Sequence, residues 1–203
     1  MVTGKRVVLA SNNRGKLAEM SALLGPHALD VVPVSRFCAE APEETGDTFV
    51  ANALLKARHA ARVSKLPAIA DDSGIEVDAL GGAPGVHSAR YAGDHGDDAA
   101  NNSKLLSALA DVADAYRTAR FRCVLVFVRS EQDTHPVIAD AAWEGHILRT
   151  PQGVGGFGYD PLFQPLGMTI SSAELNAEEK NLRSHRGMAM RRFLQLLLVG
   201  GDL

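Results

Sequence analysis

The order of apolar runs and helical patterns along the chain predicts an α/β fold. Residues 6–10, RVVLA, are a short apolar run typical of a buried strand. After a polar loop, apolar residues recur at helical spacing at Leu17, Met20, Leu23 and Leu24. Residues 121–128, FRCVLVFV, are apolar on both faces apart from Arg122, which is typical of a central strand buried between two layers. These patterns predict a sheet flanked by helices.

The other elements follow from the same periodicities and from turn residues. Residues 31–34 contain Pro33, which favours an edge strand because proline has no N–H to donate to a neighbouring strand. The remaining expectations, in chain order, are a long helix at 48–64, a half-exposed strand at 75–80, a helix at 98–110, strands at 136–143 and from 145, and a last helix capped by Ser184.

The polar loop at residues 11–16, SNNRGK, lies between the first strand and the first helix. A helix start presents unpaired backbone N–H groups and a positive dipole end, and Lys16 adds a formal charge, so this loop predicts a phosphate site. It is not a Walker A loop, because the upstream glycine is missing and Leu17 stands where Ser or Thr is required. The alternative is a plain helix cap formed by Ser11 or Asn12.

Two adjacent carboxylates, Asp71 and Asp72, follow the apolar run at 66–70. Successive side chains of a strand point to opposite faces, so only one of the two can readily face a given site. A carboxylate at a buried strand end needs a partner, and Mg²⁺ is commonly held by one or two carboxylates plus phosphate oxygens. Glu44 is a candidate second carboxylate, and Lys56 lies on a polar stripe of the helix at 48–64. The alternative is a strand end followed by turn residues.

The second unusual stretch is residues 153–163, GVGGFGYDPLF, in which glycines surround Phe157. A bare backbone carrying an aromatic ring suits a flat ligand that stacks on the ring, and the alternative places Phe157 in the core. Near the C-terminal end, Lys180, His185 and Arg186 cluster beside a helix start. Cations at that end oppose the helix dipole, and we expect them to serve an anionic or carbonyl-bearing ligand.

The residue totals are those of an ordinary globular protein, with 203 residues, 46% hydrophobic, 22% charged and a net charge of −3. A general nucleic-acid binder would carry a basic surface, so we expect no nucleic-acid partner. The two cysteines, Cys38 and Cys123, lack metal-ligand spacing, which favours a reducing, cytoplasmic compartment. The apolar runs at 7–10 and 193–199 are too short for a signal peptide or a membrane span, so no membrane partner is expected.

Five motifs occur along the chain in the order SNNRGKLAEM, EETGDTFVANALLKARHAA, ADDSGIEVDALGGAPGVHSARYAG, GGFGYDPLF and AELNAEEKNLRSHRG. Together they resemble the non-canonical purine nucleoside triphosphate pyrophosphatases, the inosine/xanthosine triphosphatase family. The resemblance extends from about residue 6 to residue 195. Each motif alone is weak, and all of them in one order are very specific.

The resemblance implies an elongated α/β fold in which a long mixed sheet is flanked by helices and two lobes leave an active-site cleft between them. It implies a single domain over residues 1–203, a homodimer, and hydrolysis of ITP, dITP or XTP at the α–β phosphoanhydride with Mg²⁺, giving the monophosphate and pyrophosphate.

The family's residue roles fall on matching positions of this chain. The resemblance implies that Glu44 and Asp72 hold the metal and that Asp72 also acts as the base for water. It implies that phosphate is bound by Ser11, Asn12, Asn13, Arg14, Gly15, Lys16 and Lys56. It implies that the rest of the nucleotide is bound by Ser73, Phe157, Gly158, Tyr159, Asp160, Lys180, His185 and Arg186.

Purine selectivity is expected from the donors at residues 180–186. Lysine and arginine can only donate hydrogen bonds, so the base edge that they meet must accept. Hypoxanthine and xanthine present a 6-oxo group there, whereas adenine presents an amino group.

Three rival functions are a pyrophosphatase for modified pyrimidine nucleotides, a module that binds nucleotides without hydrolysis, and a P-loop kinase. The motif order disfavours the pyrimidine pyrophosphatase. The presence of both Glu44 and Asp72 disfavours a module that only binds, and the loop at 11–16 disfavours a P-loop kinase.

Overall fold

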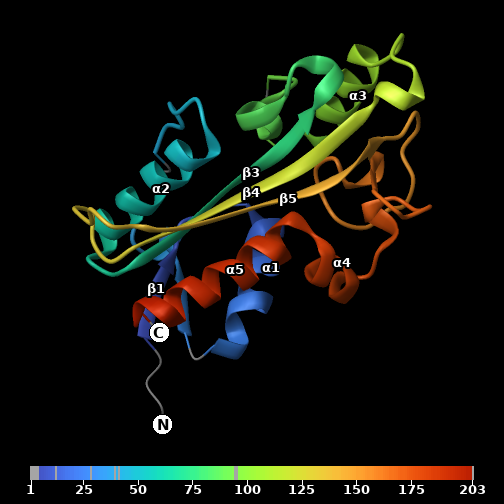
Figure 1. Cartoon of the computed structure of the whole chain (residues 1–203). Helices are drawn as coiled ribbons and strands as arrows, with labels where there is room; N and C mark the ends of the chain where they lie inside the picture. The colour runs from blue at the N-terminus through green and yellow to red at the C-terminus, as the bar shows by residue number, and fades with distance from the viewer. Residues whose placement is uncertain are drawn as a thin grey trace. The chain divides into compact units, whose positions relative to one another are not determined.

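The structure is a computed structural model that describes residues 5–11, 13–27, 29–38, 40, 42–93 and 96–202. The helices are α1 (Arg14–Leu24), α2 (Phe49–Ser64), α3 (Asp98–Ala108), α4 (Ala177–Arg183) and α5 (His185–Gly200) (Figure 1). The strands are β1 (Lys5–Leu9), β2 (Leu29–Pro33), β3 (Ala68–Val77), β4 (Thr118–Val128), β5 (Val137–Ile147) and β6 (Phe163–Pro165).

The strands form one six-stranded sheet in the order β2-β1-β3-β4-β5-β6. β1 pairs in parallel with both β2 and β3, whereas β5 pairs antiparallel with β6, so the sheet is mixed. β2 ends in Pro33 at one edge and β4 lies in the interior of the sheet, as the sequence predicted. The predicted fold class, a mixed α/β sheet flanked by helices, is confirmed.

The chain divides into two compact units that are discontinuous in sequence. Unit 1 contains residues 1–72, 123–141 and 186–203, and unit 2 contains residues 73–122 and 142–185. Strands β3, β4 and β5 therefore contribute residues to both units. The predicted single domain over 1–203 and the predicted cleft between two lobes stay predictions.

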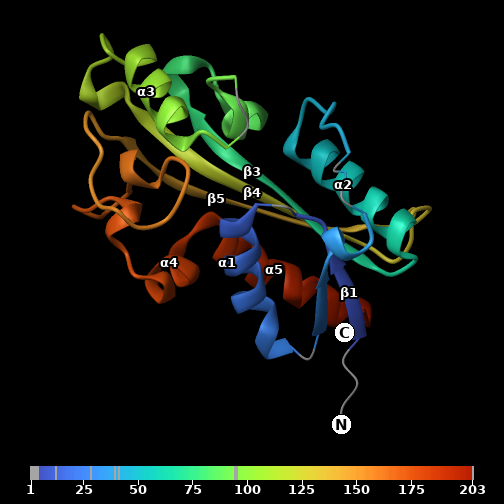
Figure 2. The same ribbon diagram turned by 180° about the vertical axis from the view of Figure 1, so that it is seen from behind.

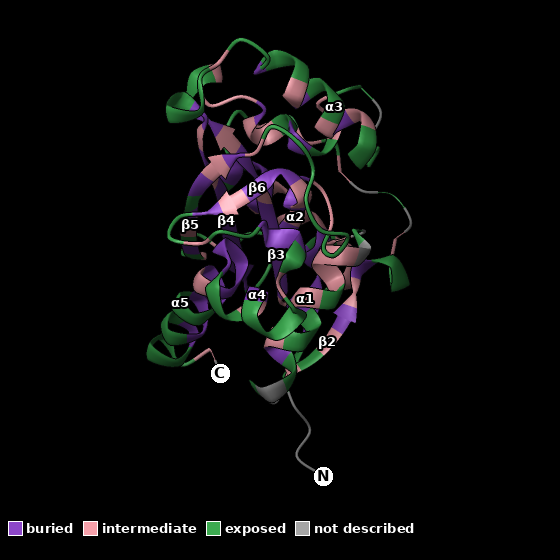
Figure 3. Cartoon of the chain, turned by 90° about the vertical axis from the view of Figure 1, so that its right-hand side faces the viewer, coloured by how far each residue is buried: buried purple, intermediate pink, exposed green. Residues whose placement is uncertain are grey.

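In unit 1, α1 and α5 cover one face of the sheet and α2 covers the other, as both Figure 1 and Figure 2 show. The core on the α1 and α5 side includes Met20, Leu24, Ile69, Leu125 and Phe193. α2 turns small residues toward the sheet, with Ala53, Ala57 and Ala60 fully buried. Figure 3 shows the burial concentrated on the strands, while the outer faces of α1 and α5 are exposed. The site-bearing strands of unit 1 therefore lie between two helical layers, buried on both faces.

Unit 2 has an aromatic core of its own. Phe163 packs edge-on against Phe121, with 4.6 Å between ring centroids, and against Trp143 at 5.4 Å. The ring of His185 stacks on the ring of Phe121, with 4.8 Å between their centroids. Gly145 makes room for this packing, because a Cβ there would lie 2.3 Å from the carbonyl oxygen of Gln164 on β6.

Two expectations about strand boundaries are wrong. β3 does not end at the aspartates but continues through residues 71–74 to Val77, because cations satisfy the buried carboxylates without a turn. The predicted strands at 136–143 and from 145 are one strand, β5, since Gly145 lies within it to allow the close approach of β6.

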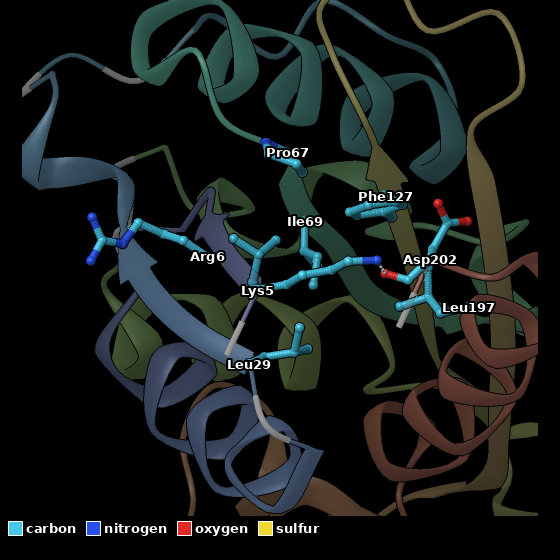
Figure 4. Close-up of a pocket in the computed structure, with 9 residues that line it drawn as sticks. Lys5, Arg6, Leu29, Pro67, Ile69, Phe127, Leu197 and Asp202 are labelled. Carbon is cyan, nitrogen blue, oxygen red and sulfur yellow. Dashed lines mark hydrogen bonds between the residues drawn. The ribbon is translucent and has the colours of Figure 1, made fainter. Parts of the chain in front are cut away.

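A cavity of about 200 Å³ lies in unit 1 among the first residues of β1 and β3 (Figure 4). Its lining includes Leu29, Ile69, Phe127 and Leu197, and the ammonium group of Lys5 donates to the backbone oxygen of Asp202 at 2.9 Å. None of the predicted site residues that the structure describes lines this cavity. Among the described residues, no helix is long and apolar enough to cross a membrane.

The two thiols differ in burial, and this difference is testable. Cys123 is fully buried on β4, and burial raises the pKa of its thiol to about 12, whereas Cys38 is partly exposed. We expect a thiol reagent such as DTNB to titrate one cysteine in the native protein and both after denaturation. Cys38→Ser should abolish the native reaction, and a native chain that reacts at both cysteines would contradict the burial of Cys123.

Candidate functional site

The adjacent carboxylates of β3 face opposite helical layers of unit 1, as strand geometry predicted. Asp71 pairs with Lys16 of α1 and Arg186 of α5, whereas Asp72 pairs with Lys56 of α2. Both aspartates are buried, with exposed fractions of 1% and 5%. Each aspartate therefore pairs with cations from its own face of the sheet, and Lys56 and Lys16 each also act to lower the pKa of the aspartate on the opposite face.

The Asp71 cluster holds four charged groups in the interior of unit 1. Asp71 Oδ2 lies 3.1 Å from Lys16 Nζ and 3.6 Å from Arg186 Nη2, and Arg186 Nη1 also donates to Glu19 of α1. Burial alone would raise the pKa of Asp71, but Lys16 and Arg186 outweigh it and hold that pKa below its usual value. Burial would likewise lower the pKa of Arg186, and the two carboxylates raise it instead. The ion pairs of Asp71 with Lys16 and Arg186 therefore tie α1 and α5 to β3.

The second cluster contains Glu44, Lys56 and Asp72. Lys56 Nζ donates to Glu44 Oε1 and to Asp72 Oδ1, each at 2.8 Å. Burial raises the pKa of Asp72 despite the nearby ammonium group. Burial would lower the pKa of Lys56, but the surrounding carboxylates, Asp72 first, raise it. The predicted proximity of Glu44 to Asp72 is confirmed by their shared lysine.

The second cluster also meets the chemical requirements of a magnesium site. Asp72 Oδ2 is buried and has no hydrogen-bond partner among the described residues. Two carboxylates already surround the ammonium group of Lys56 there. In the part of the chain that the structure describes, no group of three or more His, Cys, Asp or Glu could hold a metal by itself, so further ligands would have to come from outside the protein. One or two carboxylates with further oxygens from phosphate is the usual ligand set of Mg²⁺. The residues present therefore fit a metal that is shared with a phosphate-bearing ligand.

The loop at residues 11–16 leads into the start of α1, as predicted. The helix cap is Asn13, whose side-chain oxygen accepts from the backbone N–H of Lys16 at 3.0 Å, and Ser11 Oγ accepts from the N–H of Asn13 at 3.3 Å. Of the alternative caps, Ser11 is therefore not the one used. Gly15 lies in the first turn of α1. Asn12 and the side chain of Arg14 lie outside the described residues.

In unit 2, the buried carboxylate of Asp160 organises the glycine-rich loop. It accepts from the N–H of Phe157 at 2.8 Å, from Ser172 Oγ at 2.8 Å and from Lys180 Nζ at 2.6 Å. Lys180 Nζ also lies 4.7 Å from the centroid of the Phe157 ring. Phe157 is only partly buried, so it is not a core residue, and its ring remains a candidate stacking surface.

Helix α3 supports the same loop through residues that the sequence analysis did not identify. Asp98 accepts from the N–H of Gly158 at 2.6 Å, and Asn102 donates to the Gly158 carbonyl at 2.9 Å. The hydroxyl of Tyr159 donates to the carbonyl of Ser88 at 2.8 Å. Asp98 and Asn102 share a face of α3, but nothing in their spacing pointed to this loop.

Lys180, His185 and Arg186, which we expected to serve a ligand, each have a structural contact as well. Lys180 bonds Asp160, His185 stacks on Phe121, and Arg186 pairs with Asp71 and Glu19. Each therefore contributes to its own unit, and their contact with a base stays a prediction.

The predicted site residues divide between the units as follows. Those described in unit 1 are Ser11, Asn13, Gly15, Lys16, Glu44, Lys56, Asp72 and Arg186. Those in unit 2 are Ser73, Phe157, Gly158, Tyr159, Asp160, Lys180 and His185. Ser73 follows Asp72 on β3 and is partly buried.

Comparison with known proteins gives one consistent family. The model of the Ham1 family matches residues 7–196. A protein named dITP/XTP pyrophosphatase from Thioalkalivibrio sulfidiphilus is 53% identical over 95% of this chain and 98% of its own. The protein of that name from Escherichia coli K12 is 50% identical over 97% of this chain and 100% of its own.

Solved structures agree with these sequence matches. A HAM1 protein from Coxiella burnetii superimposes with a TM-score of 0.88 at 46% identity, covering 96% of this chain and 98% of its own. A nucleoside-triphosphatase, dITP/XTP pyrophosphatase, from Mycobacterium abscessus gives a TM-score of 0.76 at 43% identity, covering 93% and 98%.

Two arginines of α5 allow the Asp71 cluster to be tested by stability. Arg186 is 2% exposed, whereas Arg192 forms a 3.4 Å pair with Asp140 in which both side chains are at least half exposed. Arg186→Leu leaves Glu19 without this cation and Asp71 with Lys16 alone, so we expect urea unfolding to show a loss of about 3–5 kcal/mol. The control Arg192→Leu should cost at most about 1 kcal/mol. Equal losses in the two variants would contradict the structural role of the Asp71 cluster.

Proposed function

The chain belongs to the Ham1 family, and on this premise we propose that it hydrolyses the non-standard purine nucleoside triphosphates ITP, dITP and XTP. Water would be added across the α–β phosphoanhydride, giving the nucleoside monophosphate and pyrophosphate. The observation that carries the proposal is the Glu44–Lys56–Asp72 cluster, in a chain about half identical to proteins named dITP/XTP pyrophosphatase over nearly its full length.

The charges of unit 1 support binding of a triphosphate. A nucleoside triphosphate carries about four negative charges, which need several cations for their neutralisation. Lys16 stands in the first turn of α1, where backbone N–H groups also point outward, and Lys56 stands between Glu44 and Asp72. Because both lysines also pair with carboxylates, Mg²⁺ would supply the remaining positive charge in a chain whose net charge is −3.

Asp72 is the group best suited to accept a proton from water. Its Oδ2 has no partner among the described residues, and burial raises the pKa of its carboxyl group. Lys56 fixes the other oxygen at 2.8 Å and so orients the carboxylate. Glu44 and Asp72 would hold Mg²⁺, which neutralises phosphate charge in such reactions. Positioning and charge neutralisation are what phosphoanhydride hydrolysis requires from a protein.

Unit 2 supports recognition of the base. The partly exposed ring of Phe157 can stack on any purine, so it adds affinity without selecting among purines. Asp160 orients the ammonium group of Lys180 beside that ring. Because an ammonium group only donates, the 6-oxo group of a purine can accept from it and the 6-amino group of adenine cannot, and each unpaired buried group costs about 1–3 kcal/mol.

Pyrophosphate release across a nucleotide panel tests this function. With Mg²⁺ present, ITP, dITP and XTP should give a monophosphate and pyrophosphate by phosphorus NMR, at kcat/KM values about a hundredfold or more above that for ATP. Excess EDTA should abolish release, because the carboxylate cluster would have lost its metal. Orthophosphate with a nucleoside diphosphate as products, or full activity in EDTA, would contradict the proposed cleavage and metal dependence.

We also propose a homodimer. The support is the family membership alone, and the prediction is a mass near twice 21.6 kDa by light scattering at micromolar concentration. A mass of one chain under those conditions would refute it.

A further inference from the structure

One buried polar side chain beside the proposed metal site has no role in the function proposed above. Asn52 of α2 is 0% exposed, although a buried amide is costly unless all its groups are bonded. Its Oδ1 accepts from the backbone N–H of Gly46 at 2.8 Å. Because that N–H can only donate, the amide orientation is fixed, and it is the Nδ2 group that has no partner among the described residues.

The bond from Asn52 holds the segment that carries Glu44. Gly46 is two residues after Glu44, and a Cβ on Gly46 would lie 2.7 Å from Asn52 Oδ1 and 2.8 Å from the Cβ of Ala51. This loop therefore lies directly against α2. Two residues of chain span at most about 7 Å, so fixing Gly46 restricts the position of Glu44.

Asn52 also lies beside Lys56, one helical turn earlier on the same face of α2. Lys56 is the group that bonds both Glu44 and Asp72. Among the described residues, Asn52 Nδ2 is thus a buried donor without an acceptor and Asp72 Oδ2 is a buried acceptor without a donor. An oxygen ligand, either water or phosphate, would satisfy the first, and a cation or a water would satisfy the second.

From these contacts we propose that Asn52 is a positioning residue, which sets Glu44 opposite Asp72 for binding of a divalent cation. Its buried N–H is then satisfied by an oxygen ligand of the occupied site. The inference rests on the proposed metal-dependent function. In it, Asn52 acts indirectly, by fixing the position of Glu44. Groups that orient metal ligands typically change metal affinity or activity by about 10–100-fold when they are removed.

Asn101 of α3 provides a matched control. It is 2% exposed, its Oδ1 accepts from the N–H of Ala92 at 2.7 Å, and its Nδ2 donates to the carbonyl of Ala89 at 3.4 Å. It therefore holds a loop against a helix as Asn52 does, but with both ends of its amide bonded within the protein. Asn52→Leu and Asn101→Leu should both lower the melting temperature, whereas only Asn52→Leu should affect metal binding.

The experiment measures Mn²⁺ affinity of the full chain by electron paramagnetic resonance, with Mn²⁺ alone as the probe. Asn52→Leu should weaken binding by about tenfold or more, and Asn101→Leu by less than about twofold. Gly46→Ala keeps the asparagine but displaces the loop, and should weaken binding as Asn52→Leu does. In ITP hydrolysis, raising the Mg²⁺ concentration should restore turnover of Asn52→Leu toward that of the wild type, which a loss of folded protein would not allow.

Wild-type Mn²⁺ affinity in folded Asn52→Leu or Gly46→Ala would overturn the inference, as would equal weakening in Asn101→Leu. A wild-type chain that binds no Mn²⁺ would overturn it together with the metal site. A wild-type chain that binds Mn²⁺, with the expected variant effects, but releases no pyrophosphate from ITP would contradict the proposed function and support the role of Asn52.

Discussion

Two carboxylates next to each other in a buried strand impose a constraint that the rest of unit 1 satisfies. Asp71 and Asp72 cannot stay charged in the interior without cations, and strand geometry sends them to opposite faces. On each face of the sheet, a helix must therefore place a cation within contact distance of the aspartate that points to that face. α1 and α5 supply Lys16 and Arg186 on one face, and α2 supplies Lys56 on the other.

The two faces differ in how fully their charges are matched. Around Asp71, two cations meet two carboxylates, and the pKa of Asp71 is held below its usual value. Around Asp72, one lysine serves two carboxylates, and the pKa of Asp72 is raised. Binding sites differ from structural clusters in this way, because a ligand provides the remaining partners.

Features set by local periodicity were predictable from the sequence. They include the strand at 6–10, the central strand, the helix from residue 49 and the opposite orientation of the two aspartates, since all depend on neighbouring residues. The partners of Arg186 were not predictable. Glu19 is 167 positions away from Arg186 in the sequence, and the residues around Glu19 are those of an ordinary exposed helix surface. The continuation of β3 through residues 71–74 was missed for the same reason: turn-forming residues predict a break unless distant cations make the strand favourable. The role of Asp160 as the centre of its loop likewise depends on Ser172 and Lys180.

The central claim is that the two aspartates have different tasks, Asp71 in stability and Asp72 in hydrolysis. Asp71→Asn and Asp72→Asn test it most directly when urea unfolding and turnover of ITP are measured on both. Asp71→Asn should lower the free energy of unfolding by about 3 kcal/mol, because Lys16 and Arg186 lose a buried partner. Asp72→Asn should cost less stability, since Lys56 keeps Glu44, but should lower turnover by about two to three orders of magnitude. Near-normal turnover of Asp72→Asn with Mg²⁺ present would contradict the account.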